Sequence, residues 1–197
     1  AVNTLGTIIH NALEELYTLY FNQFLTLHHI EAMEIRIDEV ILKHFKEIYK
    51  EGEITKGKNL LAFEVAKRNV YNFLQLEKKD IEADQAIKVL LLEASLSCEI
   101  EVKSLTFPIK IAGKVDRIEE RDGNIRIIDY KTGKVDGNSL KIQDFGDLTS
   151  DIKNEKIIQL LCYALMFENH ELKQNREVSA GIVSFKNMKN GFLPFGL

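Results

Sequence analysis

The chain has 197 residues, of which 45% are hydrophobic and 28% charged, and its formal net charge at pH 7 is −4. This length suits one domain, or one domain with a helical extension, and the composition is that of a globular protein. The acidic balance argues against a protein that grips nucleic acid by charge alone, because phosphate neutralisation supplies most of such affinity. The sequence has no signal peptide and no run of 18 apolar residues, so we expect a cytoplasmic protein without a membrane segment.

The first half of the chain has the apolar spacing of helices. Three helices are predicted, over residues 5–27 with Asn3 or Thr4 as the N-cap, over 31–49 and over 58–78. The pair His28-His29 has no partner at a metal-ligand spacing, so we assign it to a helix end. Residues 1–85 are therefore expected to form a helical N-terminal segment.

From Ala86 onward the apolar period changes to that of strands. Strands are predicted over residues 86–102, 107–120 and 124–133, followed by a long mobile loop over 134–153, a helix over 155–169 and a last strand over 178–185. The helix is apolar almost all round, which predicts that it is buried. This order predicts a mixed α/β fold in which residues 86–197 form the core and the helical segment covers it, as one compact domain.

Cysteine content and the chain ends give two further expectations. Cys98 and Cys162 lie in apolar runs with no Cys-x-x-Cys or Cys/His spacing, which argues against a disulfide framework, a zinc site or a four-cysteine iron–sulfur cluster. We expect two buried thiols in a reducing compartment. Because the sequence starts without methionine and ends without a polar tail, we expect a piece of a longer polypeptide, with N-terminal processing as the alternative.

Residues 113–134, GKVDRIEERDGNIRIIDYKTGK, place acids and a lysine where strand residues are usually apolar. Asp122-Gly123 favours a two-residue type I′ turn. With that turn, Asp116 lies directly opposite Asp129, where Cβ atoms are about 4.5–5.5 Å apart. The period of two puts Lys131 on the same face as Asp129. The sequence thus predicts two carboxylates and an ammonium on one patch.

Two carboxylates on one patch need a compensating positive charge. One solution is a structural ion cluster, in which Lys131 and Arg117 neutralise the acids. The other is a hard divalent cation such as Mg²⁺, held by carboxylates and a substrate phosphate. The hairpin alone leaves both solutions open.

Polar residues outside the hairpin are further candidates. Gln159 and Tyr163 lie one turn apart in an apolar helix, a pattern more typical of a satisfied core contact. His10 borders the apolar stripe of the first helix, where a lone histidine is more often structural. Glu93 breaks the apolar run VLLLEASL, with Glu99 and Glu101 as competing choices because they share its strand face.

The ordered set GTIIHNALE, GKVDRIE, IIDYKTG and QLLCY resembles the nuclease domain of the RecB/AddB-like branch of the PD-(D/E)XK superfamily. The resemblance extends from Gly6 to about Phe185 and implies a restriction-endonuclease-like core sheet flanked by helices. By this resemblance, Asp116 and Asp129 bind Mg²⁺ or Mn²⁺ and Lys131 is the catalytic lysine.

The same resemblance extends to the residues outside the hairpin. His10 resembles the additional metal ligand of this branch, and Gln159 and Tyr163 resemble its helix motif. Glu93 resembles its upstream acid, with Glu99 as the alternative. Some relatives carry a four-cysteine iron–sulfur cluster, which two cysteines cannot build, so none is expected here.

The function implied by the resemblance is metal-dependent, exodeoxyribonuclease-like hydrolysis of DNA. The expected partners are DNA and a helicase domain or subunit, because relatives are usually parts of helicase–nucleases that process broken DNA ends. The first alternative is a nuclease-like module that has lost catalysis and only binds DNA. It is disfavoured because every expected position is filled. The second is an α/β domain with a structural ion cluster.

Overall fold

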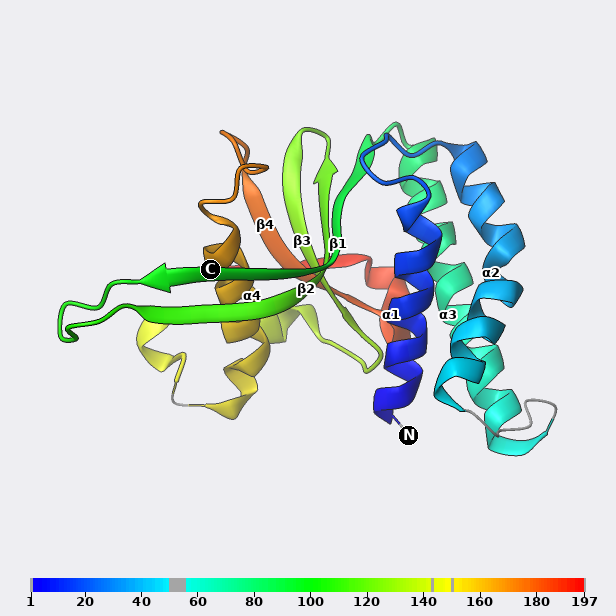
Figure 1. Cartoon of the computed structure of the whole chain (residues 1–197), viewed down its shortest axis with the longest axis horizontal. Coiled ribbons are helices and arrows are strands. Elements are labelled where there is room, and N and C mark those ends of the chain that lie inside the picture. The colour runs from blue at the N-terminus through cyan, green and yellow to red at the C-terminus, as the bar shows by residue number, and fades with distance from the viewer. Residues whose placement is uncertain (1, 50–55, 143, 150, 197) are drawn as a thin grey trace.

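A five-stranded mixed sheet is flanked by helices on both faces in the computed structural model, which describes residues 2–49, 56–142, 144–149 and 151–196 (Figure 1). The strands follow the order β1-β2-β3-β4-β5, with β3 and β4 parallel and the other neighbours antiparallel. In chain order the elements are α1 (Val2–Thr18), α2 (Leu27–Ile48), α3 (Gly57–Glu82), β1 (Ile87–Ile100), β2 (Ile109–Arg121), β3 (Asn124–Lys131), η1 (Gly137–Leu140), η2 (Phe145–Asp147), η3 (Ile152–Asn154), α4 (Glu155–Phe167), β4 (Val178–Ser184), η4 (Phe185–Asn190) and β5 (Phe192–Pro194). The predicted mixed α/β architecture is confirmed.

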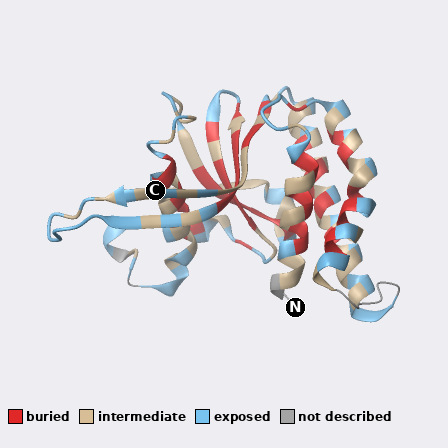
Figure 2. Cartoon of the chain, viewed as in Figure 1, coloured by how far each residue is buried: buried red, intermediate tan, exposed pale blue. Residues whose placement is uncertain are grey.

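Two apolar cores lie on opposite faces of the sheet, and strand alternation divides the side chains between them. On β3, Ile128 and Tyr130 belong to the core shared with α1, α2 and α3. Ile125 and Ile127 belong to the core shared with α4. Figure 2 shows the buried residues on the inward faces of the helices and in the centre of the sheet. The helical segment therefore packs on one face of the sheet through a core that both contribute to.

The hairpin between β2 and β3 has the predicted turn and register. Asp122 and Gly123 both have positive φ, 51° and 85°, as a type I′ turn requires. Arg117 pairs with Ile128, which is the register that a two-residue loop dictates. The short-range turn rule therefore positions the acidic residues of both strands.

Helix α1 ends at Thr18, so the prediction that it continues to Leu27 is wrong. The backbone N–H groups of Asn22 and Leu25 donate to carbonyls of β1 instead of continuing the helix. Thr26 then caps α2 in a reciprocal capping box with His29, which confirms that the histidine pair marks a helix end. Asn3 and Thr4 lie inside α1 and not at its cap, because the helix already includes Val2.

The second half differs from the prediction in several places. The segment predicted as a loop contains the 3₁₀ helices η1, η2 and η3, each preceded by an aspartate that accepts a backbone hydrogen bond two residues on. Helix α4 is buried on one face only, since Ile158 and Leu165 are exposed. Cys98 and Cys162 are half-buried, not buried, and form no disulfide. Strand β5 was not predicted, because three residues are too few for a periodic signal.

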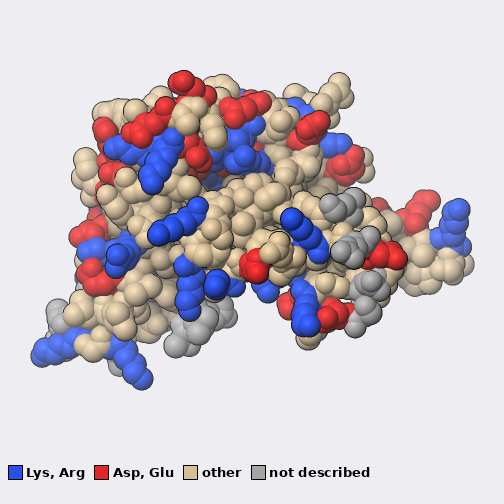
Figure 3. Space-filling model, turned by 180° about the vertical axis from the view of Figure 1, so that it is seen from behind, with Lys and Arg blue, Asp and Glu red and all other residues tan. Residues whose placement is uncertain are grey.

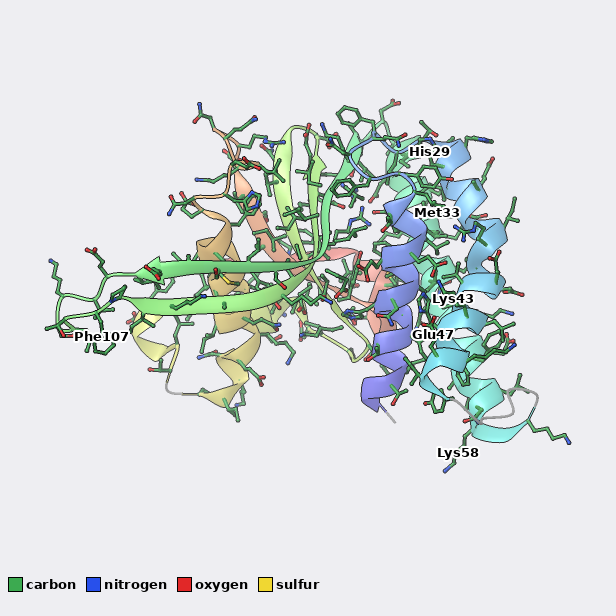
Figure 4. The ribbon with its side chains drawn as sticks, viewed as in Figure 1. His29, Met33, Lys43, Glu47, Lys58 and Phe107 are labelled. Atoms are coloured by element: carbon green, nitrogen blue, oxygen red, sulfur yellow. The ribbon has the colours of Figure 1, made fainter. Side chains whose placement is uncertain are left out.

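The outer parts of β1 and β2 form a two-stranded arm that projects from the sheet (Figure 1). This β1–β2 arm, residues 94–115, pairs only with itself, because β2 pairs with β3 only from Arg117 onward. Phe107 lies at its far end (Figure 4). The arm starts beside Glu93, whose φ of +46° is unusual for a non-glycine residue. Among the described residues, no helix is both long and apolar enough to cross a membrane.

Candidate active site

Three elements bring an imidazole and two carboxylates together. His10 comes from α1, Glu93 from β1 and Asp116 from β2. His10 Nδ1 lies 3.4 Å from Glu93 Oε1 and 3.3 Å from Asp116 Oδ1. One ligand atom from each residue lies within 4.8 Å of the others. One nitrogen and two oxygens in this arrangement are a donor set that a divalent cation can accept.

Tyr130 holds two members of this group in position. Its backbone N–H donates to Asp116 Oδ2 at 2.6 Å. Its ring meets the His10 ring edge-on, with centroids 5.6 Å apart. Pairing of β2 with β3 ends at Arg117 and Ile128, one position before the predicted pair of Asp116 and Asp129. Where the backbone pairing ends, the Asp116 side chain accepts a hydrogen bond from the Tyr130 backbone N–H. A side-chain hydrogen bond therefore replaces the backbone pairing at this position.

A second polar group connects β3 with α4. Lys131 Nζ lies 2.8 Å from Asp129 Oδ2 and donates to Gln159 Oε1 at 3.0 Å. Gln159 Nε2 donates to Asp129 Oδ1 at 3.1 Å and to the Tyr163 hydroxyl at 2.7 Å. The side-chain amide of Gln159 thus accepts a hydrogen bond through its oxygen and donates hydrogen bonds through its nitrogen. This network fixes the direction of the lysine and of the Asp129 carboxylate.

Asp129 Oδ2 keeps capacity for a further ligand. The atom is buried, and within the described part of the chain it has no hydrogen bond of good geometry, although the Lys131 ammonium is close. Buried carboxylate oxygens usually have partners. A carboxylate oxygen of this kind can accept a hard cation, and the charge of the nearby Asp116 acts on the same carboxylate.

A cavity of about 570 Å³ opens over this arrangement. Its lining includes His10, Glu93, Lys131 and Thr132. Lys114 also lines the cavity, and its ammonium lies 2.7 Å from Glu93 Oε2. The carboxylate of Glu93 and the ammonium groups of Lys114 and Lys131 therefore share one hollow.

A family model described as the PD-(D/E)XK nuclease superfamily matches residues 1–192. The chain belongs to the PD-(D/E)XK nuclease superfamily. A search of curated protein sequences finds no match. Membership agrees with the mixed sheet between helical layers, which is a restriction-endonuclease-like fold. Nucleases of this superfamily use divalent metal ions, and the donor set of His10, Glu93 and Asp116 suits such an ion.

Burial and neighbouring charges shift the pKa values of Asp129 and His10 in this superfamily member. Burial and the nearby charge of Asp116 raise that pKa to about 6, although Lys131 acts in the opposite direction. Burial would lower the pKa of His10, but its hydrogen bonds to Asp116 and Glu93 and their charges raise it to about 10. A divalent cation bound by these acids would offset the repulsion and displace the imidazole proton.

The PD-(D/E)XK chain departs from the sequence expectation about one partner of the acids. Arg117, considered as a partner for them, points to the opposite face of the sheet, where Glu77 and Glu119 bind it. Of the two basic residues proposed to neutralise the acids, Lys131 is the one that pairs with them, at 2.8 Å from Asp129 Oδ2. Of the two candidates for the upstream acid, Glu93 lies beside His10, whereas Glu99 is exposed on the β1–β2 arm.

Sequence reasoning did not select Lys114 or the anchoring role of Tyr130. Lys114 is one of several lysines in a charged hairpin, and no local spacing rule connects it with Glu93. Tyr130 is part of the Asp-Tyr-Lys stretch, but its contribution through a backbone N–H carries no side-chain signal.

Without metal, the nuclease is expected to lose stability as pH rises from about 6.5 to about 10. The folded-state pKa of His10 lies above its ordinary value of 6.5, so the stabilisation from protonated His10 is complete below 6.5 and lost through 10. Thermal unfolding in chelator across this range measures the effect. The His10→Gln variant should show a flatter pH dependence, and His28→Gln, at an exposed position, should follow the parent protein. Identical curves for His10→Gln and the parent would contradict the assignment.

Proposed function

We propose that this chain is a Mg²⁺- or Mn²⁺-dependent deoxyribonuclease domain of the RecB/AddB-like branch, which hydrolyses phosphodiester bonds of DNA. The observation that carries the proposal is the cluster of His10, Glu93 and Asp116, next to a cavity that His10, Glu93 and Lys131 line and with Lys131 paired to Asp129. The imidazole of His10 and the carboxylates of Glu93, Asp116 and Asp129 would hold the metal. The ammonium of Lys131 would act on the phosphate.

Phosphodiester cleavage needs a nucleophile at neutral pH and relief of negative charge. When bound, a divalent cation lowers the pKa of water and neutralises phosphate oxygens. Lys131 would orient the attacking water or stabilise the charge that develops on phosphorus oxygens. Gln159 would keep the lysine in place, since it accepts from Nζ while its own amide is held by Tyr163 and Asp129. His10 must give up its proton to act as a ligand.

We place this domain in a helicase–nuclease that acts at DNA double-strand breaks. The net charge of −4 supports a substrate delivered by a motor, because the chain has no basic surplus for capturing DNA alone. On the side of the molecule in Figure 3, basic and acidic side chains are interspersed. Residues 1–85 and 86–197 are proposed to act as one unit, because the helical segment supplies His10 to the acids of the sheet.

Digestion of labelled linear DNA tests the proposed function. Cleavage is expected with Mg²⁺ or Mn²⁺ and is expected to stop with chelator or in the Asp116→Asn variant. Asp84→Asn makes the same chemical change at an exposed position with φ of +62°, which asparagine tolerates, and should cleave normally. DNA binding without cleavage under either metal would favour the inactive binding module. Chelator-resistant cleavage would refute the metal site.

A further inference from the structure

The β1–β2 arm has an outer face that neither core uses. Along β2, Ile111 and Gly113 face α4, and a Cβ placed on Gly113 would lie 3.3 Å from Met166. Strand alternation turns the residues between them the other way, and Lys110, Ala112 and Lys114 are all exposed. On β1, the exposed Ser95, Ser97 and Glu99 pair with Lys114, Ala112 and Lys110 respectively. These six residues define the outer face of the arm.

Lys114 connects this face with the candidate active site. Its ammonium lies 2.7 Å from Glu93 Oε2, while its side chain remains 58% exposed. It lines the same cavity as His10 and Lys131. The outer face is therefore a continuation of the cavity wall. If the Glu93 oxygens turn to a cation, the Lys114 ammonium becomes available for another anion next to it.

Lys110 extends the positive charge away from the cavity. It lies four residues from Lys114 on the same strand face, about 13 Å at the usual rise per residue. Glu99 is its register partner, but no ion pair joins them among the residues that the structure describes. A B-form strand rises only about 3.4 Å per nucleotide along the helix axis, so this separation exceeds a single nucleotide step. Lys110 and Lys114 thus suit two different phosphates of one DNA strand.

We infer that the outer face of the β1–β2 arm binds the DNA backbone on one side of the scissile phosphate, with Lys114 nearest the cleavage point and Lys110 farther along the strand. The inference rests on the proposed function. A nucleic acid suits this face better than an apolar partner, because its side chains are lysines and short residues, with Glu99 as the one acid. The large exposed apolar side chains of the arm are Leu105, Phe107 and Ile109, none of which belongs to the outer face.

Lys110→Ala is the decisive variant, because Lys110 is exposed and outside the metal site. With a 30-nucleotide substrate, KM is expected to rise about three- to tenfold with kcat unchanged, and the salt slope of binding to fall by about one. Glu99→Gln should lower KM, because it removes the acid opposite Lys110. Lys46→Ala, at an exposed position of α2, is the matched control and should change neither quantity.

Substrate length distinguishes DNA binding along the outer face of the arm from a general effect of removing one positive charge. In a series of progressively shorter substrates, Lys110→Ala should match the parent protein once the DNA is too short to reach Lys110 from the cleaved bond. Cleavage by the parent with equal KM values for Lys110→Ala and Lys46→Ala would overturn the inference and leave the proposed function standing. DNA binding that weakens in Lys110→Ala, without cleavage by any variant, would support DNA binding by the outer face and refute the proposed nuclease activity. Absence of both binding and cleavage would overturn both.

Discussion

Replacing Lys131 with alanine is expected to lower kcat for DNA cleavage by about 10²- to 10³-fold, the loss typical when a group that stabilises transition-state charge is removed. The ammonium lies in the cavity, 2.8 Å from Asp129 and hydrogen-bonded to Gln159. Because Lys131 lowers the pKa of Asp129, its loss should also move the pH–rate profile to higher pH. Single-turnover cleavage across a pH series measures both effects.

Two further variants separate this role from general loss of charge. Lys134→Ala removes an exposed lysine three residues along the chain and should leave kcat unchanged. Gln159→Ala removes the group that accepts from Lys131, and it should reduce kcat less than Lys131→Ala because the ion pair with Asp129 remains. Cleavage at the parent rate by Lys131→Ala would exclude the lysine from the chemistry.

Replacing Glu77 with alanine is expected to lower the free energy of unfolding by about 3–5 kcal/mol, the usual cost of removing one partner from a buried ion pair. Arg117 is fully buried, and its guanidinium binds Glu77 Oε1 at 2.6 Å. The Tyr17 hydroxyl also donates to Glu77, and the Tyr17 ring stacks on Arg117. Loss of the carboxylate leaves a buried hydroxyl without its acceptor and a guanidinium with Glu119 alone.

Urea unfolding, followed by circular dichroism, measures this change. Glu82→Ala, at an exposed position of the same helix, should change the free energy of unfolding by less than about 0.5 kcal/mol. Glu77→Gln should cost less than Glu77→Ala, because the amide oxygen can still accept from Tyr17. A decrease of less than about 1 kcal/mol in the free energy of unfolding for Glu77→Ala would show that the buried contacts of Glu77 with Arg117 and Tyr17 contribute little to stability.

Local rules predicted the parts of the site that depend on neighbours in sequence. The Asp122-Gly123 turn sets the register of β2 and β3, and helical spacing puts Gln159 and Tyr163 on one face. The approach of His10 to Glu93 joins a helix and a strand, and no local rule gives such a contact. That part of the prediction depended on family resemblance.

Long-range contacts also explain the predictions that were wrong. The end of α1 is set by hydrogen bonds to β1, which compete with helical hydrogen bonds and leave no composition signal. Arg117 has a charge that suits the acids of the hairpin, but strand alternation and its buried partner Glu77 turn it to the opposite face. Charge patterns in a sequence therefore identify candidates for pairing, while the layer on each side of the sheet decides the partners.

The positive φ of Glu93 ties the shape of the molecule to its chemistry. A glycine would adopt this backbone conformation freely, whereas a glutamate pays about 1–3 kcal/mol for it. The residue whose carboxylate lies beside His10 is also the one that immediately precedes the projecting arm of residues 94–115. A candidate metal ligand and the start of the projecting hairpin thus meet at one strained backbone position.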